Sequence, residues 1–233
     1  CILIAGIHAE GDTTVRQPGR SRDHTERMMK AMGADVEIDG LNITVRRSEL
    51  SALDTRVPAD ISGAAFWLVA GCCHPNARIR VRGVGLNPTR TGVLDVLKAM
   101  GGRITVENVR QEQGEPSADL VAESSTLRGV DISGDIVPRV IDELPVLALA
   151  ACFATGTTTI RDAKELRVKE SDRIAATVEG LSRLGAHVEE REDGMEIHGG
   201  ARLTGSECSS FGDHRIAMTM AIAGLMAKGE TTV

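Results

Sequence analysis

The stretch that decides the fold is DELPVLALAACFATGTTTI, which runs from Asp142 to Ile160. Its first half is apolar on every side of a helix, and such a helix is stable only when other elements cover it all round. Gly156 can end the helix in a left-handed turn, and the Thr and Ile residues that follow favour a strand. This stretch therefore predicts an internal helix followed by a strand.

The same unit occurs four times along the chain. The other copies span Cys1–Val15, Asp60–Val81 and Asp213–Val233. Gly11 and Gly229 stand at the turns of the first and last copies, as Gly156 does in the third. We therefore expect four buried helices, each followed by a strand rich in Thr, Val and Ile.

A second unit alternates with the first. It consists of an amphipathic helix that ends at a glycine, followed by a strand of alternating apolar and polar residues. The three copies span Glu26–Ile38, Val93–Val106 and Val178–Glu190. The alternation predicts a compact α/β fold of pseudo-symmetric units, with buried helices inside and sheets around them.

The run SELSALDTRVPAD, Ser48–Asp60, breaks this alternation. We therefore predict a domain boundary near Ala52–Pro58. Residues 1–55 should form the C-terminal part of one domain, and residues 56–233 most of another. Because the first unit opens within a helix and the last lacks its amphipathic partner, we expect the chain to be a piece of a longer protein.

Composition excludes several classes of function. The formal net charge is −6 and aromatic residues make up only 2% of the 233 residues, which disfavours a nucleic-acid or anionic-membrane binder. No apolar run approaches about 20 residues. The five Cys are odd in number, and we interpret them as thiols of a cytoplasmic protein. The six His show no metal-ligand spacing, so no metal site is predicted.

The segment ELRVKESDRI, Glu165–Ile174, combines three cations with three acids. Lys169 and Arg173 are four residues apart and can face one pocket. Arg167, in a segment that we expect to be extended, should point to the same side. Such a cluster suits a carboxylate or phosphate ligand. The alternative is a solvated turn in which acids and bases pair locally.

An acid precedes three of the apolar helices, namely Asp60, Asp142 and Asp213. Each can be an N-cap. We expect the helix after the charged segment to begin at Glu170 or Ser171. Arg215 lies in the first turn of its helix, where a cation is unfavourable unless an anion binds beside it. We therefore predict that Arg173 and Arg215 converge on one anion.

These motifs together resemble the 5-enolpyruvylshikimate-3-phosphate (EPSP) synthase family. The resemblance rests on five motifs in the family's order along the whole chain: SRDHTERM (Ser21–Met28), TRTG (Thr89–Gly92), IDELP (Ile141–Pro145), KESDR (Lys169–Arg173) and DHRIAM (Asp213–Met218). They look most like the bacterial branch that includes glyphosate-tolerant enzymes. Some members carry an amide four residues before the lysine, where this chain has Glu165.

The resemblance implies two similar domains, each an inside-out α/β barrel with buried helices and outer sheets, and a substrate site in the cleft between them. The implied reaction moves the enolpyruvyl group of phosphoenolpyruvate to the 5-hydroxyl of shikimate 3-phosphate and releases phosphate, without a cofactor or metal. The chain would carry about half of this site. Its partners would be anionic small molecules and its own missing N-terminal segment, and the complete enzyme would be a monomer.

Residue roles follow from the same resemblance. Asp142 matches the carboxylate that binds the shikimate hydroxyls and accepts a proton, and Glu170 the acid that protonates phosphoenolpyruvate. Arg173 and Arg215 match the arginines that hold phosphoenolpyruvate. Lys169 and Arg22 match contacts to shikimate 3-phosphate.

Two alternatives remain at this point. A related enolpyruvyl transferase that acts on a UDP-amino sugar would share the fold, although KESDR and IDELP favour the shikimate enzyme. The chain could also be a non-catalytic half that functions only by complementing its missing segment.

Overall fold

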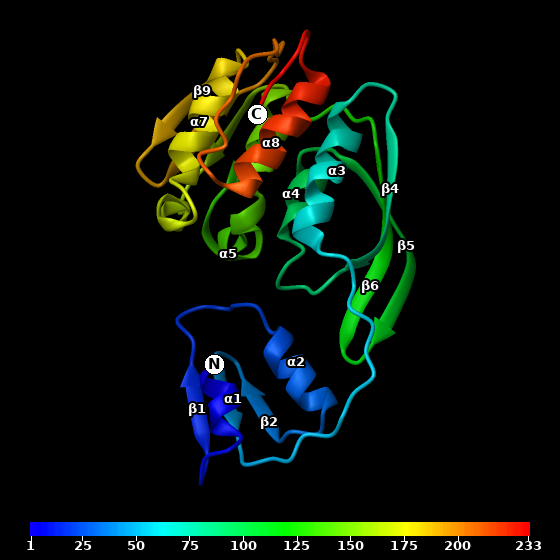
Figure 1. The fold of residues 1–233 in the computed structure, drawn as a ribbon, viewed down its shortest axis with the longest axis vertical. Coiled ribbons are helices and arrows are strands. Elements are labelled where there is room, and N and C mark those ends of the chain that lie inside the picture. The colour runs from blue at the N-terminus through cyan, green and yellow to red at the C-terminus, as the bar shows by residue number, and fades with distance from the viewer.

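The computed structural model describes residues 1–233 and consists of two lobes joined by one connecting segment of the chain (Figure 1). The small lobe, blue in Figure 1, has two helices beside a three-stranded sheet. Its elements are α1 (Ile2–Gly6), β1 (Thr13–Arg16), α2 (His24–Ala31), β2 (Val36–Asp39) and β3 (Asn42–Val45).

The large lobe begins with a helix and ends with one. Its first unit comprises α3 (Ile61–Cys73), β4 (Arg78–Gly85), α4 (Gly92–Ala99), β5 (Arg103–Glu112) and β6 (Glu115–Glu123). The next comprises β7 (Asp131–Ile132), η1 (Gly134–Ile136), α5 (Val137–Val140), η2 (Ile141–Glu143), α6 (Leu144–Cys152), β8 (Thr157–Ile160), η3 (Lys164–Val168), α7 (Arg173–Arg183), β9 (His187–Arg191) and β10 (Gly194–His198). The last element is α8 (His214–Met226).

The three sheets share one strand order, which confirms the repeated unit. The orders are β1-β3-β2, β4-β6-β5 and β8-β10-β9, with the short β7 added parallel to β8. In each sheet the strand that follows the apolar helix (β1, β4 or β8) pairs with the last strand of the unit (β3, β6 or β10). The second and last strands of each unit form an antiparallel hairpin. The same helix–strand alternation therefore produces the same sheet three times.

The internal helices connect parallel segments of chain. The segments before α3, α6 and α8 form parallel bridges to those after them, at Ala59–Val84, Arg128–Thr155 and Thr204–Lys228. Each helix is therefore the crossover of a parallel pair, and this connection lays it across the inner face of its sheet.

The core of the large lobe lies between α3, α6 and α8, with one sheet on either side (Figure 1). Every residue of α6 is buried, as the apolar sequence predicts. The core is built from aliphatic side chains, and Phe66 is its one fully buried aromatic residue. The fold is thus inside-out, with helices in the middle and sheets outside.

Two of the apolar helices are not covered on all sides, so that prediction is wrong for them. On α1, Ile2 is 62% exposed and Ile4 is 53% exposed; on α8, Leu225 is 60% exposed. Trp67, on the otherwise buried α3, is also half exposed. The physical reason is that no further element of this chain packs over these faces.

Left-handed glycines end the amphipathic helices as predicted. Gly33, Gly101 and Gly185 have φ of +92°, +93° and +92°, values that residues with a Cβ rarely adopt. The chain therefore turns at the same point in each copy and enters the following strand in the same direction.

The connection between the lobes, residues 46–58, contains no helix or strand. Backbone hydrogen bonds from Ser51 to Met32 and from Ala59 to Gly83 fix its two ends, and none is made between them. The small lobe has its own seven-residue apolar core and the large lobe a separate one of 47 residues.

None of the helices combines the length and the apolar character that crossing a bilayer requires.

We expect limited trypsin digestion of the chain to cut first in this connection, after Arg56, because that bond is exposed and lacks backbone hydrogen bonds. Mass spectrometry of the first products should find fragments 1–56 and 57–233. Earlier cleavage within either lobe, with residues 52–58 intact, would argue against a domain boundary here.

Candidate active site

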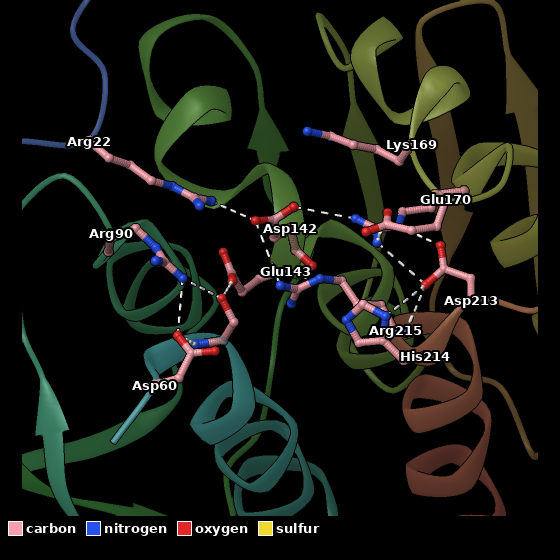
Figure 2. Close-up of polar contacts among 12 residues, drawn as sticks. Arg22, Asp60, Arg90, Asp142, Glu143, Lys169, Glu170, Asp213, His214 and Arg215 are labelled. Atoms are coloured by element: carbon pink, nitrogen blue, oxygen red, sulfur yellow. Dashed lines mark hydrogen bonds and ion pairs between the residues drawn. The ribbon is translucent and has the colours of Figure 1, made fainter. Parts of the chain in front are cut away.

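Seven charged side chains gather where the internal helices of the large lobe begin (Figure 2). They are Arg22, Asp142, Lys169, Glu170, Arg173, Asp213 and Arg215. These helix ends lie on the side of the large lobe that faces the small lobe (Figure 1). Helix N-termini carry partial positive charge, so three of them meeting at one place favour an anion.

Asp142 lies at the centre of this cluster (Figure 2). It stands in the 3₁₀ turn η2 just before α6 and makes no capping hydrogen bond, so the alternative that it is an N-cap does not hold. Its carboxylate instead accepts from Arg22 Nη2 at 2.5 Å and from Arg173 Nη1 at 3.3 Å. Arg215 Nη2 lies 3.7 Å from the same carboxylate.

Cations keep Asp142 ionised. Burial by itself would raise the pKa of this carboxyl, but the hydrogen bond from Arg22 opposes it. The nearby charges of Arg215 and Lys169 add to that effect, and the pKa falls below its ordinary value. The site therefore holds a stable negative charge inside a ring of cations.

Arg173 is the most enclosed cation of the cluster, with 1% of its surface exposed. It donates to Asp213 Oδ2 from Nε at 2.7 Å and to Glu170 Oε2 from Nη2 at 2.5 Å. Since Nη1 faces Asp142, its guanidinium joins three carboxylates. A buried cation is tolerated only with such partners.

Asp213 caps α8, as predicted, by accepting from the backbone N–H of Arg215 at 2.8 Å. It also accepts from the Ser171 hydroxyl at 3.1 Å. Burial opposes ionisation of Asp213, but the hydrogen bonds from Arg173, the Arg215 backbone and Ser171 outweigh it and lower its pKa. Asp213 thereby fastens the start of α7 to the start of α8.

The predicted start of α7 was wrong by about two residues. The helix begins at Arg173, and Asp172 is its cap, with an N–H···O distance of 3.0 Å from Ala175. Asp is a stronger N-cap than Glu, and the Ser171 hydroxyl is taken up by Asp213. Glu170 consequently stays outside the helix, free to face the cluster.

Arg167 does not join the site, contrary to the prediction. Its segment forms the 3₁₀ helix η3 rather than an extended chain, so alternation does not apply. Arg167 turns to β9 and pairs with Glu190 at 2.8 Å and with Asp172 at 2.9 Å. Lys169 does lie at the edge of the cluster (Figure 2), where its ammonium pairs with Glu165.

The guanidinium groups of Arg173 and Arg215 converge, as expected from their helix positions. They approach opposite oxygens of one carboxylate, that of Asp142. Arg22 reaches the same group from the small lobe, 120 residues away in sequence. The three arginines thus meet at the carboxylate of Asp142.

A second polar network next to Asp142 was missed by the sequence reasoning. Glu143 is 2% exposed and accepts from the Ser62 hydroxyl, which in turn accepts from Arg90 at 2.7 Å. Arg90 also pairs with Asp60, the predicted cap of α3. Burial raises the pKa of Glu143, although Ser62 opposes the shift. A polar Ser62 in the first turn of an otherwise apolar helix was the available signal.

The lobes also touch beside the site. Arg27 donates to the Gly114 carbonyl at 2.7 Å, His24 lies 2.8 Å from Glu115, and Asn87 donates to Asp23 at 2.7 Å. These contacts tie the start of α2 to the β5–β6 hairpin.

The cluster around Asp142 presents carboxylates that guanidinium groups already cover. This set of donors suits organic anions better than a metal cation.

Comparison with known proteins shows the family of the chain. The family model of EPSP synthase (3-phosphoshikimate 1-carboxyvinyltransferase) matches residues 1–233. The chain is 56% identical to the 3-phosphoshikimate 1-carboxyvinyltransferase of Gloeobacter violaceus and 54% identical to that of Geotalea uraniireducens. All of this chain and 54% of each relative are covered, so the chain spans about half their length.

Solved structures show the same relationship. An EPSP synthase from Acinetobacter baumannii superimposes with a TM-score of 0.92 at 45% identity, covering 98% of this chain and 53% of that one. The enolpyruvyl transferase NikO from Streptomyces tendae has a TM-score of 0.76 at 22% identity, covering 98% of this chain and 52% of NikO, which shows a shared fold. Since the family model matches from end to end and the fold is that of a solved EPSP synthase, the chain belongs to the EPSP synthase family.

Proposed function

We propose that the chain forms part of an enzyme that transfers the enolpyruvyl group of phosphoenolpyruvate to the 5-hydroxyl of shikimate 3-phosphate and releases phosphate. The observation that supports this most directly is the ring of Arg22, Arg173 and Arg215 around one carboxylate. Both substrates are polyanions, and guanidinium groups bind carboxylate and phosphate in bidentate geometry.

We assign the cations of the cluster, Lys169 included, to the two substrates. Arg173 and Arg215, at the starts of α7 and α8, hold phosphoenolpyruvate. Arg22 from the small lobe and Lys169 from the large lobe hold shikimate 3-phosphate, which therefore bridges the lobes. Asp142 binds the shikimate hydroxyls at the point where the two groups of cations meet.

Glu170 and Asp142 move the protons. Glu170 gives a proton to the methylene carbon of phosphoenolpyruvate, and the 5-hydroxyl oxygen attacks the adjacent carbon while its proton passes to Asp142. The resulting tetrahedral adduct loses phosphate, which takes up the proton held by Asp142, and its new methyl group returns a proton to the Glu170 carboxylate as the double bond re-forms. Asp142 and Glu170 both touch Arg173, so one guanidinium links the base to the acid.

Substrate binding also prepares Asp142 to act as a base. In the free site, cations hold its pKa low. Substrate phosphate and carboxylate groups take over the donors of Arg22, Arg173 and Arg215, and each donor lost from Asp142 lets its pKa rise. The carboxylate becomes a better proton acceptor when its substrates are in place.

The chain needs the rest of the enzyme to complete its two domains. We assign residues 1–55 to one domain and 56–233 to the other. The exposed apolar side chains of α1, α3 and α8, including Ile2, Trp67 and Leu225, are the faces that the missing segment covers. The completed enzyme is a cytoplasmic monomer and a target of glyphosate.

Complementation tests this proposal. The chain is mixed with the N-terminal segment of the Gloeobacter violaceus relative, and phosphate release is measured with phosphoenolpyruvate and shikimate 3-phosphate. Activity that needs both pieces supports a split enzyme, and the chain carrying Asp142→Asn is the inactive control. A stable but inactive complex would identify a non-catalytic half. Activity with a UDP-amino sugar in place of shikimate 3-phosphate would favour the related transferase.

A further inference from the structure

Two histidines and two glutamates meet on the outer face of the β9–β10 hairpin, on the sheet surface remote from the internal helices. In the antiparallel register His187 lies opposite His198 and Glu189 lies opposite Glu196. Residues two apart on a strand share a face, so all four side chains point outward, while Val188 between them is buried. His187 and His198 are eleven residues apart in sequence, a spacing that has no metal signature by itself.

The distances match the coordination shell of a small divalent ion. Glu189 Oε1 lies 3.4 Å from His187 Nε2 and 3.4 Å from His198 Nε2. In a tetrahedral zinc site with bonds of about 2.0–2.1 Å, neighbouring ligand atoms are separated by about 3.3–3.4 Å. The three ligand atoms lie within 4.8 Å of one another, so small side-chain rotations suffice to place one ion among them.

His198 carries an unsatisfied nitrogen that points into this cluster. Its Nε2 is inaccessible to solvent and has no hydrogen-bond partner, although buried polar atoms are nearly always paired. Its other nitrogen, Nδ1, lies 3.4 Å from the Thr157 hydroxyl on the neighbouring β8. This is the arrangement of a metal-binding histidine, with one nitrogen held by an outer partner and the other free for the ion.

Arg191 binds both glutamates through the oxygens that do not face the histidines. Its Nη2 donates to Glu189 Oε2 at 2.8 Å and to Glu196 Oε2 at 2.9 Å. The Oε1 atoms of both carboxylates are left on the histidine side, and Glu196 Oε1 lies 3.6 Å from His198 Nε2. Glu189 therefore has a fixed orientation, and Glu196 or water can fill a fourth position.

We propose that His187, Glu189 and His198 form a binding site for a borderline divalent transition-metal ion of the Zn²⁺ class. Two imidazoles and one carboxylate suit Zn²⁺, Ni²⁺ or Cu²⁺, whereas Mg²⁺ and Ca²⁺ prefer shells of oxygen ligands. The ion joins β9 to β10 at the edge of the sheet and stabilises the hairpin. The site is independent of the enolpyruvyl transfer chemistry.

Isothermal titration of the tag-free chain with Zn²⁺ tests the proposal. We expect one equivalent to bind, and no binding of Mg²⁺ at the same concentrations. The variants His187→Gln, His198→Gln and Glu189→Gln should each weaken Zn²⁺ binding by at least the 10–100-fold that loss of an outer-shell partner typically produces. His74→Gln, which changes an exposed histidine on the α3–β4 turn, is the matched control and should bind as the parent does.

Two further measurements locate the ion. Cu²⁺ bound to the parent should show an electron paramagnetic resonance pattern of two nitrogen ligands, which either His variant reduces to one. Cys1→Ser removes the exposed N-terminal thiol and should leave Zn²⁺ affinity unchanged. The proposal is overturned if no Zn²⁺ binds, if binding disappears with Cys1→Ser, or if the three site variants, shown by circular dichroism to be folded, keep the parent's affinity.

Discussion

Replacing Asp142 by Asn in the complete enzyme is expected to cut turnover by about 10²–10⁴-fold, the typical contribution of a general base. Asn keeps the size of the side chain and has one oxygen that can still accept from Arg22 or from Arg173, but it cannot take a proton from the 5-hydroxyl. Steady-state phosphate release at saturating substrate measures the effect. Glu170→Gln should produce a loss of the same order, because the N–H groups of an amide are far too weakly acidic to protonate the methylene carbon.

Asp172→Asn is the matched control for this result. Asp172 lies two residues from Glu170 and caps α7, but its carboxylate pairs with Arg167 rather than with the central cluster. The variant should lose at most about 1 kcal/mol of stability and keep turnover close to normal. Near-normal turnover in Asp142→Asn or Glu170→Gln would remove that residue from the mechanism.

Replacing Asp213 by Asn is expected to lower the free energy of unfolding by about 3 kcal/mol, the lower end of the range for breaking a buried ion pair. Asp213 and Arg173 are both 1% exposed, and 2.7 Å separates the paired atoms. The loss stays at the lower end because Arg173 keeps Glu170 and Asp142 as partners. Urea unfolding of the chain at pH 7 measures the difference.

The same difference should depend on pH. The folded-state pKa of Asp213 is lowered, so its ionised form contributes stability above the unfolded value of about 3.9. That contribution is lost as pH falls through the folded-state pKa. The difference in the free energy of unfolding between the parent and Asp213→Asn should be constant above about pH 5 and should become smaller below about pH 4. A difference that does not change down to pH 3 would show that ionisation of Asp213 is not what stabilises the fold.

Two variants control for other causes. Glu179→Gln removes an exposed ion pair with Arg183 on α7 and should change stability by less than about 1 kcal/mol. Combining Asp213→Leu with Arg173→Met replaces the buried pair by apolar side chains of similar size. This double variant should regain part of the lost stability, whereas Asp213→Leu alone should not.

The repeated architecture was predictable because its signals are local. A helix that is apolar all round, a glycine with φ near +90° and a Thr-rich strand each depend on neighbouring residues. Their alternation recurs along the chain, so the repetition of one unit was predictable, whereas the third strand of each sheet and the strand order were not. The motifs around Asp142 and Lys169 likewise located the candidate site.

The errors have physical causes that a local pattern does not contain. An extended segment would place Arg167 in the site, but the segment forms the 3₁₀ helix η3 and turns the side chain to β9. The apolar sequence of α1 predicted full burial, yet Ile2 and Ile4 are exposed since no element packs over them. Side-chain direction and coverage depend on which elements meet, and short-range propensity does not encode that.

The sequence by itself determined the secondary-structure units, their order, the turns and the residue types available for chemistry, since backbone propensity and periodicity act over a few neighbouring positions. Only the tertiary structure decided that Arg22 meets Asp142, that Glu143 meets Ser62 and that His187 lies opposite His198. These contacts form only when the helices and sheets pack together and the strands pair in one register. The packing of the whole core, rather than any single segment, provides the free energy that selects this arrangement.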